Sequence, residues 1–145
     1  MVGRDLAFWD TSGIVLLCVP QRDASRALAV RRTSPPGVLW WGTRLEVRSA
    51  LARLVREQVI DDPGRTAAWQ RYERIEKVSR LVEPAREVLD LASVLVDDHP
   101  LRSGDALQLA AALSLVRGKP KNRVFVAFDI RLAAVARDVG FDVRP

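Results

Sequence analysis

Short, continuous apolar runs alternate with stretches of helical periodicity along this chain of 145 residues, and this alternation restricts the fold more than any other feature. Leu6 to Trp9, Val38 to Trp41 and Val124 to Phe128 have the length of buried strands, and a helical pattern follows each of them. Strands that lack polar alternation are typical of parallel sheets covered on both faces. The sequence therefore predicts an α/β fold in three layers, α/β/α, with a central, mainly parallel sheet of four to five strands.

The remaining elements are predicted between these runs. Two weaker strands are expected at 78–82, at an edge of the sheet, and at 141–143. Helices are expected at 12–19, 23–32, 43–59, 65–77, 84–96, 102–117 and 130–139, with Pro84 starting the fifth, Ser103 capping the sixth and Gly140 ending the last. Because no linker, repeat or low-complexity tract divides the chain, residues 1–145 are predicted to form one domain.

Composition restricts the classes of function. The net charge is +5, and of the 23 basic residues only three are lysine. Since the arginine guanidinium suits bidentate contact with phosphate, nucleic acid is a plausible partner. Cys18 lies inside an apolar run and is expected to be a buried small hydrophobe. The apolar stretch from Leu107 to Val116 is too short to span a bilayer, and Arg4 and Asp5 do not introduce a signal peptide, so we expect a cytoplasmic protein.

Four carboxylates adjoin these apolar segments, and they are the leading candidates for a functional site: Asp10, Glu46, Asp105 and Asp129. Each has a structural explanation of its own, as a helix N-cap or as an anion in the first turn of a helix. Three of them follow predicted strands, however, and in a parallel sheet the carboxyl ends of the strands meet at one edge. A single site for Mg²⁺ or Mn²⁺, which prefer oxygen ligands, explains all four positions at once.

Other classes of protein with an early aspartate after a strand fit the residues poorly. A metal-dependent adhesion site calls for a second serine where Ile14 stands, and an aspartate-nucleophile phosphatase calls for an aspartate where Ser12 stands. A receiver domain calls for a lysine after a late strand, and none follows Val124 to Phe128. The chain also has no phosphate-binding glycine loop.

The residues resemble the PIN-domain family, and more narrowly the VapC-type toxins of type II toxin-antitoxin pairs. The resemblance covers nearly the whole chain and depends on the strand ending in Asp10-Thr11-Ser12, the helix with Glu46, and the segments at 101–110 and 125–132. It implies a PIN-like fold in which Asp10, Glu46, Asp105 and Asp129 form the metal site and the Ser12 hydroxyl positions ligands or metal-bound water. Gln108 occupies a position where relatives often carry histidine or tyrosine.

The resemblance further implies an endoribonuclease, dependent on Mg²⁺ or Mn²⁺, that hydrolyses RNA by metal-activated water. An inhibitory antitoxin and a homodimer are the implied protein partners, with the helix of Trp69 and Tyr72 as a candidate interface. Basic side chains beside the acids are candidates for contacts with RNA phosphates, namely Arg44, Arg48, Arg102 and Arg131. Two alternatives stay open, a non-catalytic PIN-like module that binds RNA or protein, and a metal-dependent nuclease acting on DNA.

Overall fold

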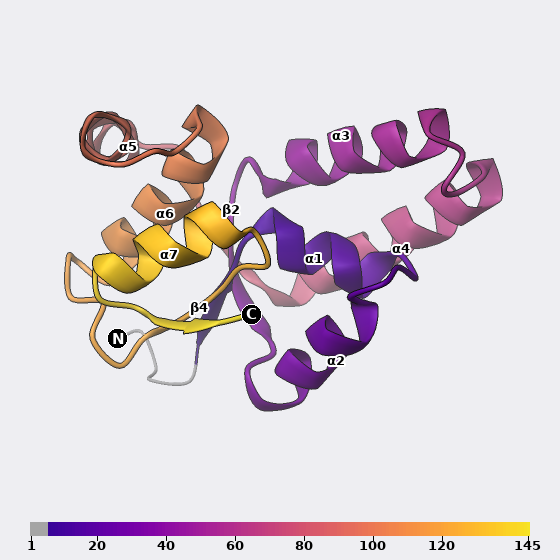
Figure 1. Ribbon diagram of the computed structural model, residues 1–145, viewed down its shortest axis with the longest axis horizontal. Coiled ribbons are helices and arrows are strands. Elements are labelled where there is room, and N and C mark those ends of the chain that lie inside the picture. The colour runs from indigo at the N-terminus through magenta and orange to yellow at the C-terminus, as the bar shows by residue number, and fades with distance from the viewer. Residues whose placement is uncertain (1–5) are drawn as a thin grey trace.

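The computed structural model describes residues 6–145 and contains seven helices and five strands in that range (Figure 1). The segment with Arg4 and Asp5, on which the signal-peptide argument depended, lies outside the described residues. In chain order the elements are β1 (Ala7–Trp9), α1 (Thr11–Cys18), α2 (Ala24–Thr33), β2 (Pro36–Trp40), α3 (Thr43–Arg56), α4 (Asp62–Val78), β3 (Arg80–Val82), α5 (Arg86–Asp98), α6 (Ser103–Leu115), β4 (Val124–Val126), α7 (Ile130–Asp138) and β5 (Asp142–Arg144).

The five strands form one sheet in the order β3-β2-β1-β4-β5, and every neighbouring pair is parallel. β1 lies at the centre because its two neighbours, β2 and β4, are added on opposite sides. The sheet confirms the predicted α/β fold, with the edge strand β3 where it was expected. All five carboxyl ends consequently point to the same edge of the sheet.

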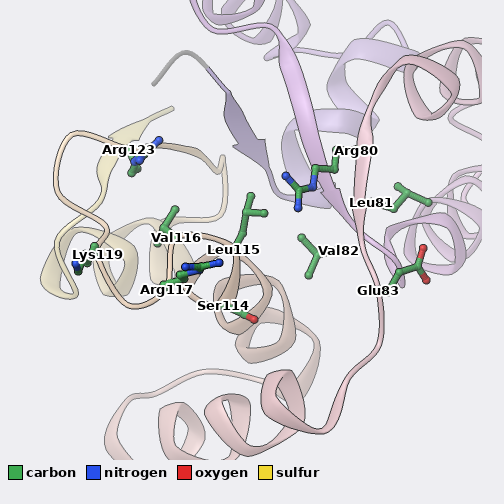
Figure 2. Close-up of a pocket in the computed structure, with 10 residues that line it drawn as sticks. All are labelled: Arg80, Leu81, Val82, Glu83, Ser114, Leu115, Val116, Arg117, Lys119 and Arg123. Atoms are coloured by element: carbon green, nitrogen blue, oxygen red, sulfur yellow. The ribbon is translucent and has the colours of Figure 1, made fainter. Parts of the chain in front are cut away.

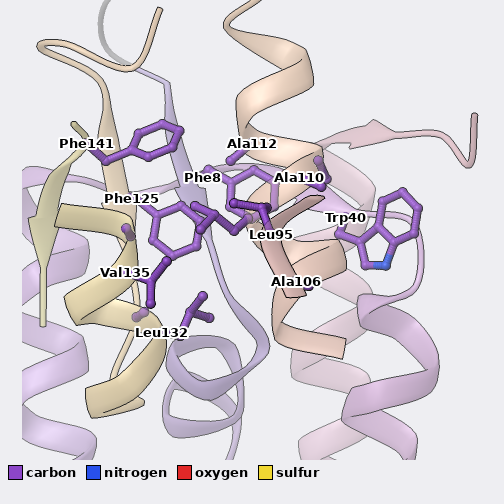
Figure 3. Packing of buried hydrophobic residues seen from close by; sticks show 14 of the residues in the cluster. Phe8, Trp40, Leu95, Ala106, Ala110, Ala112, Phe125, Leu132, Val135 and Phe141 are labelled. Carbon is purple, nitrogen blue, oxygen red and sulfur yellow. The ribbon is translucent and has the colours of Figure 1, made fainter. Parts of the chain in front are cut away.

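One face of the sheet packs against α5, α6 and α7 (Figure 3). Phe8 and Phe125 of the neighbouring strands β1 and β4 stack there with ring centroids 5.3 Å apart. Leu109 of α6 is completely buried in the same cluster, which stabilises the fold by roughly 1.5 to 3 kcal/mol. The helix predicted at 102–117, which contains the apolar stretch from Leu107 to Val116, is therefore a core helix.

The opposite face of the sheet packs against α1, α3 and α4. Trp9 and Leu39, which alternate along their strands with residues of the first face, point into this second cluster. Tyr72 of α4 is fully buried here and donates its hydroxyl to Glu76. The two clusters establish the three layers, and the burial of Tyr72 removes that side chain from the candidate interface on α4.

Several predicted boundaries were wrong for identifiable reasons. Helix α3 ends at Arg56 and not near 59, because Gln58 takes a left-handed backbone with φ of 59°. Pro84 does not start α5, which begins two residues later after the extended Ala85. Ser103 is the first residue of α6, and Arg102 precedes it without a side-chain cap. Gly140 does follow α7, with φ of 111° that favours glycine.

None of the helices in residues 6–145 has the length and apolar character needed to cross a membrane.

Candidate active site

The topology brings the four predicted carboxylates to the carboxyl edge of the sheet. Asp10 follows the central strand β1, and its backbone N–H donates to Val126 O of β4 at 2.9 Å. Glu46 lies in the first turn of α3, after β2, and Asp105 lies in the first turn of α6. Asp129 follows β4 and is the N-cap of α7. The expectation that the strand ends converge here is met.

Asp10 is the innermost of the four acids and is only 3% exposed. Its Oδ2 accepts a hydrogen bond from Ser12 N at 3.1 Å, which caps α1 as predicted. Burial is the main reason that the pKa of Asp10 rises to about 7, and the nearby charges of Glu46 and Asp105 raise it further. A negative charge at this position is therefore costly unless a cation shares it.

Glu46 is half-buried and reaches across to α6. An amide N–H of Gln108 faces its Oε2 at 3.4 Å, and a methyl group on Gly104 would lie 3.7 Å from its Oε1. The pKa of Glu46 is raised, first by burial and then by the charge of Asp105, although hydrogen bonds from Thr11 and Gln108 favour the carboxylate. Glu46 thus shares one electrostatic environment with Asp10 and Asp105.

Asp105 and Asp129 line a hollow of about 720 Å³ together with Arg102 and Arg131. The pKa of Asp105 is raised by burial and then by the charge of Asp129, and Arg102 opposes both effects. Asp129 is exposed, and its Oδ1 accepts a hydrogen bond from Leu132 N at 2.9 Å. Asp129 therefore stands at the rim of the site, whereas the other three carboxylates form its inner group.

Ser12 connects two of the segments that carry these acids. Its Oγ accepts a hydrogen bond from Phe128 N at 2.9 Å, so the start of α1 holds the loop that leads to Asp129. Ser12 also hydrogen-bonds the Asp10 carboxylate, which lowers the pKa of that group against the effect of burial. Ser12 thus contacts both the Asp10 carboxylate and the loop that leads to Asp129, and its role in positioning ligands or metal-bound water stays a prediction.

The four predicted RNA-binding arginines divide into two pairs. Arg102 and Arg131 are exposed beside the acids. Arg44 turns instead toward α4, where Nη1 lies 2.7 Å from Glu76 Oε1, and its guanidinium stacks over Trp69. Arg48 stacks over the same indole ring at 4.3 Å. The structure therefore does not bring Arg44 and Arg48 into the acidic hollow.

Gln108 is a residue whose place in the site the sequence reasoning missed. It is fully buried in α6, and its Nε2 contacts Thr11 Oγ1 at 2.8 Å and Thr43 Oγ1 at 3.1 Å, in addition to Glu46. Its Oε1 finds no hydrogen-bond partner within residues 6–145. The available signal was an amide in an otherwise apolar helix, because buried polar groups normally have a hydrogen-bonding purpose.

The four carboxylates are suitable ligands for a divalent cation, although they do not lie close enough together to hold one. Across residues 6–145, no three acidic, histidine or cysteine side chains stand close enough together to hold a metal ion. The charges of Glu46 and Asp105 nevertheless raise the pKa of Asp10, and the charge of Asp105 raises the pKa of Glu46. The amide oxygen of Gln108 that has no partner belongs to the side chain that contacts Glu46. Oxygen donors that repel one another are the set that Mg²⁺ or Mn²⁺ would neutralise.

The chain is similar to known proteins in sequence and in fold. No protein-family model matches the chain. Ribonuclease VapC45 and ribonuclease VapC49, both from Mycobacterium tuberculosis, are each 32% identical over 149 aligned residues, covering 97% of this chain and 95% of the relative. The crystal structure of M. tuberculosis VapC20, described as a sarcin-ricin loop cleaving toxin, superposes with a TM-score of 0.66 and 22% identity, covering 96% of this chain and 99% of that one.

A five-stranded parallel sheet between two helical layers matches a PIN-like fold. The structural likeness supports the fold, and the sequence identity extends over nearly the whole length of the two curated relatives. The chain belongs to the VapC ribonuclease family.

Proposed function

We propose that this chain is an endoribonuclease toxin that depends on Mg²⁺ or Mn²⁺ and hydrolyses phosphodiester bonds of RNA. The observation that carries the proposal is the inner acidic group of Asp10, Glu46 and Asp105 at the carboxyl edge of the sheet. The pKa of each is raised first by burial and then by the charge of another acid of the site. Such perturbed groups at a strand edge are typical of functional sites. Membership of a family whose relatives are named ribonucleases supplies the reaction.

Some residues of the site would bind the ion, and others hold the ion-binding residues in place. Asp10, Glu46 and Asp105 would hold the ion, and Asp129 at the rim would contribute directly or through water. A bound Mg²⁺ or Mn²⁺ lowers the pKa of a water molecule and stabilises negative charge on a phosphoryl group. Gln108 orients Glu46, and Ser12 holds the loop before Asp129.

Arg102 and Arg131 are the basic residues that we assign to the RNA backbone near the scissile bond. Both are exposed and line the same hollow as Asp105 and Asp129. Phosphate contacts of this kind position the substrate without reading its sequence. Arg44 and Arg48 are less suited to this role, because their guanidinium groups stack on Trp69.

Purified protein tested for RNA cleavage with and without Mg²⁺ examines the proposal directly. We expect Asp105→Asn to abolish cleavage and Asp129→Asn to reduce it. Asp61→Asn is a matched control, because Asp61 caps α4 through Gly64 N at 2.8 Å as Asp129 caps α7. The assignment is wrong if Asp105→Asn retains full activity, or if cleavage persists unchanged in a chelator.

The same assay separates the alternatives. Equal or faster cleavage of DNA would identify a DNA nuclease. RNA binding without cleavage in any divalent metal would identify a non-catalytic module. We expect cleavage of RNA only.

An antitoxin and a second copy of the chain are the protein partners that we propose. Large apolar side chains exposed on the surface are available to such partners, among them Trp41, Leu45, Val78 and Ile130. Light scattering of the purified chain tests the homodimer. Co-purification with the product of a neighbouring small open reading frame, with loss of ribonuclease activity in the complex, tests the antitoxin.

A further inference from the structure

A second hollow lies along the edge strand β3 and beside the C-terminal end of α6, and four basic residues are part of its lining (Figure 2). It measures about 780 Å³ and lies between β3, the end of α6 and the segment before β4. Arg80 comes from β3, Arg117 and Lys119 from the loop after α6, and Arg123 from the residue preceding β4. We call this hollow the basic groove.

The charge of the basic groove is strongly one-sided. Four of its lining residues are cationic, and Glu83 is the single acid in the lining. Figure 2 shows the Arg80 and Arg117 side chains extending toward the space between β3 and α6, with the Glu83 carboxylate apart from them. Arg80, Arg117 and Lys119 are exposed, and none makes an ion pair within residues 6–145. Two segments distant in the sequence, β3 and the loop after α6, thus bring exposed cations to the lining of one hollow.

Helix dipoles explain part of this charge but not its convergence. Arg117 and Lys119 follow the C-terminus of α6, where a cation is favoured by roughly 0.3 to 1 kcal/mol. Arg80 begins a strand, so its position has no helix end to complement. The meeting of Arg80 with the two cations of the loop after α6 indicates a site for an extended anion.

The acidic centre makes such a site useful. Asp105 and Leu115 are ten residues apart on α6, so the acids and the basic groove are separated by about 15 Å along that helix. The acids repel a polyanion until a cation is bound, whereas the groove attracts it without one. The proposed cleavage site therefore lies at one end of α6, and the basic groove, whose positive charge attracts RNA, lies at the other end.

We infer that the basic groove binds the sugar-phosphate backbone of the RNA substrate at a distance from the scissile bond. This inference rests on the proposed function and extends it, since it assigns the substrate class as RNA long or folded enough to contact both ends of α6. Backbone contacts made by arginine and lysine carry affinity without base specificity. The groove supplies attraction, and the acidic edge supplies the chemistry.

Replacement of Arg80, Arg117 and Lys119 together by serine tests the inference. Binding is measured by fluorescence anisotropy at several salt concentrations, in the Asp105→Asn background so that no RNA is cut. The probe is a hairpin RNA long enough to extend from Asp105 to the groove. We expect hairpin binding to weaken about 10- to 100-fold and its salt dependence to fall by about two to three ions.

A matched variant controls for net charge. Replacement of Arg53, Arg56 and Arg65 by serine removes the same charge around the turn between α3 and α4, and it should leave hairpin binding close to that of the parent. Melting curves of both triple variants establish that each is folded.

Two results would overturn the inference. The first is unchanged hairpin binding in the groove variant. If that variant binds the hairpin normally but loses affinity for polyglutamate, the groove is a site for acidic protein and not for RNA. The second is an equal loss of hairpin binding in the groove variant and in the charge-matched variant of Arg53, Arg56 and Arg65. Neither depends on cleavage, so failure of the wild-type protein to cut RNA would be a separate result against the proposed function.

Discussion

Replacing Asp10 by asparagine should stabilise the metal-free protein while destroying its activity. The carboxyl is 3% exposed, and burial is the main cause that raises its pKa from 3.8 to about 7. When the carboxyl is ionised in both states, this rise in pKa lowers the free energy of unfolding by about 4 kcal/mol, as an upper estimate. Asparagine keeps an oxygen that can accept the hydrogen bond from Ser12 N, so the cap of α1 is retained.

The sign of the effect depends on pH. Below pH 3.8 the carboxyl is protonated in both states and contributes no difference. As the pH rises toward 7, the unfolded chain releases this proton but the folded chain keeps it, so wild-type stability falls relative to the variant. Above about pH 7 the folded chain carries the buried charge, and the difference reaches its full size.

The measurement is urea denaturation of wild type and Asp10→Asn in chelator from acidic to alkaline pH. The free energy of unfolding of the variant minus that of wild type should increase through this range and then level off. Added Mg²⁺ should stabilise wild type above neutral pH and leave the variant unchanged. If Asp10→Asn is less stable than wild type at alkaline pH, or if the difference does not vary with pH, the argument from burial and repulsion is wrong.

Three further predictions follow from particular contacts. Gln108→Leu should reduce Mg²⁺-dependent cleavage and Mn²⁺ affinity about 10- to 100-fold, because Glu46 loses its contact with the amide. In a thermal melt the stability should change by no more than about 1 kcal/mol, because leucine also removes the buried amide oxygen that has no hydrogen-bond partner. Gly13→Ala should lower the free energy of unfolding in urea by about 1 to 3 kcal/mol, because the new methyl group would lie 2.8 Å from Trp9 Cε3 in the core. Gly104→Ala is the control and should fold normally, because its methyl group would meet no atom nearer than 3.7 Å. Cys18 is buried, and burial raises the pKa of its thiol to about 12, so a thiol reagent should label it only in denaturant.

The sequence predicts most of the fold because the strand signals were apolar and short. Leu6 to Trp9 and Val124 to Phe128 contain β1 and β4, the central strand and its neighbour, and their parallel pairing placed Asp10 and Asp129 at one edge. Boundaries failed where backbone conformation decided them, as at Gln58, whose positive φ no local pattern announced. The position of an acid after a strand was therefore easier to predict than the end of a helix.

Side-chain direction was harder to predict, because long side chains choose among partners that only the folded chain provides. Arg44 follows the strand edge in sequence as the acids do, yet Glu76 and Trp69, distant in sequence, draw it to α4. Asp10 has no such freedom, since its short side chain is held between β1 and α1. Candidate arginines taken from sequence adjacency were consequently less informative than candidate aspartates.

Helix α6 shows how one buried element can connect the two proposed sites. Its first turn carries Asp105, its middle carries Gln108 against Glu46, and its end leads to the loop of the basic groove. The middle of the helix is apolar because most of its residues, from Ala106 to Ala112, are buried in the core. Any change that shifts α6 along its axis should therefore alter metal binding and RNA affinity together, whereas changes at either end should separate them.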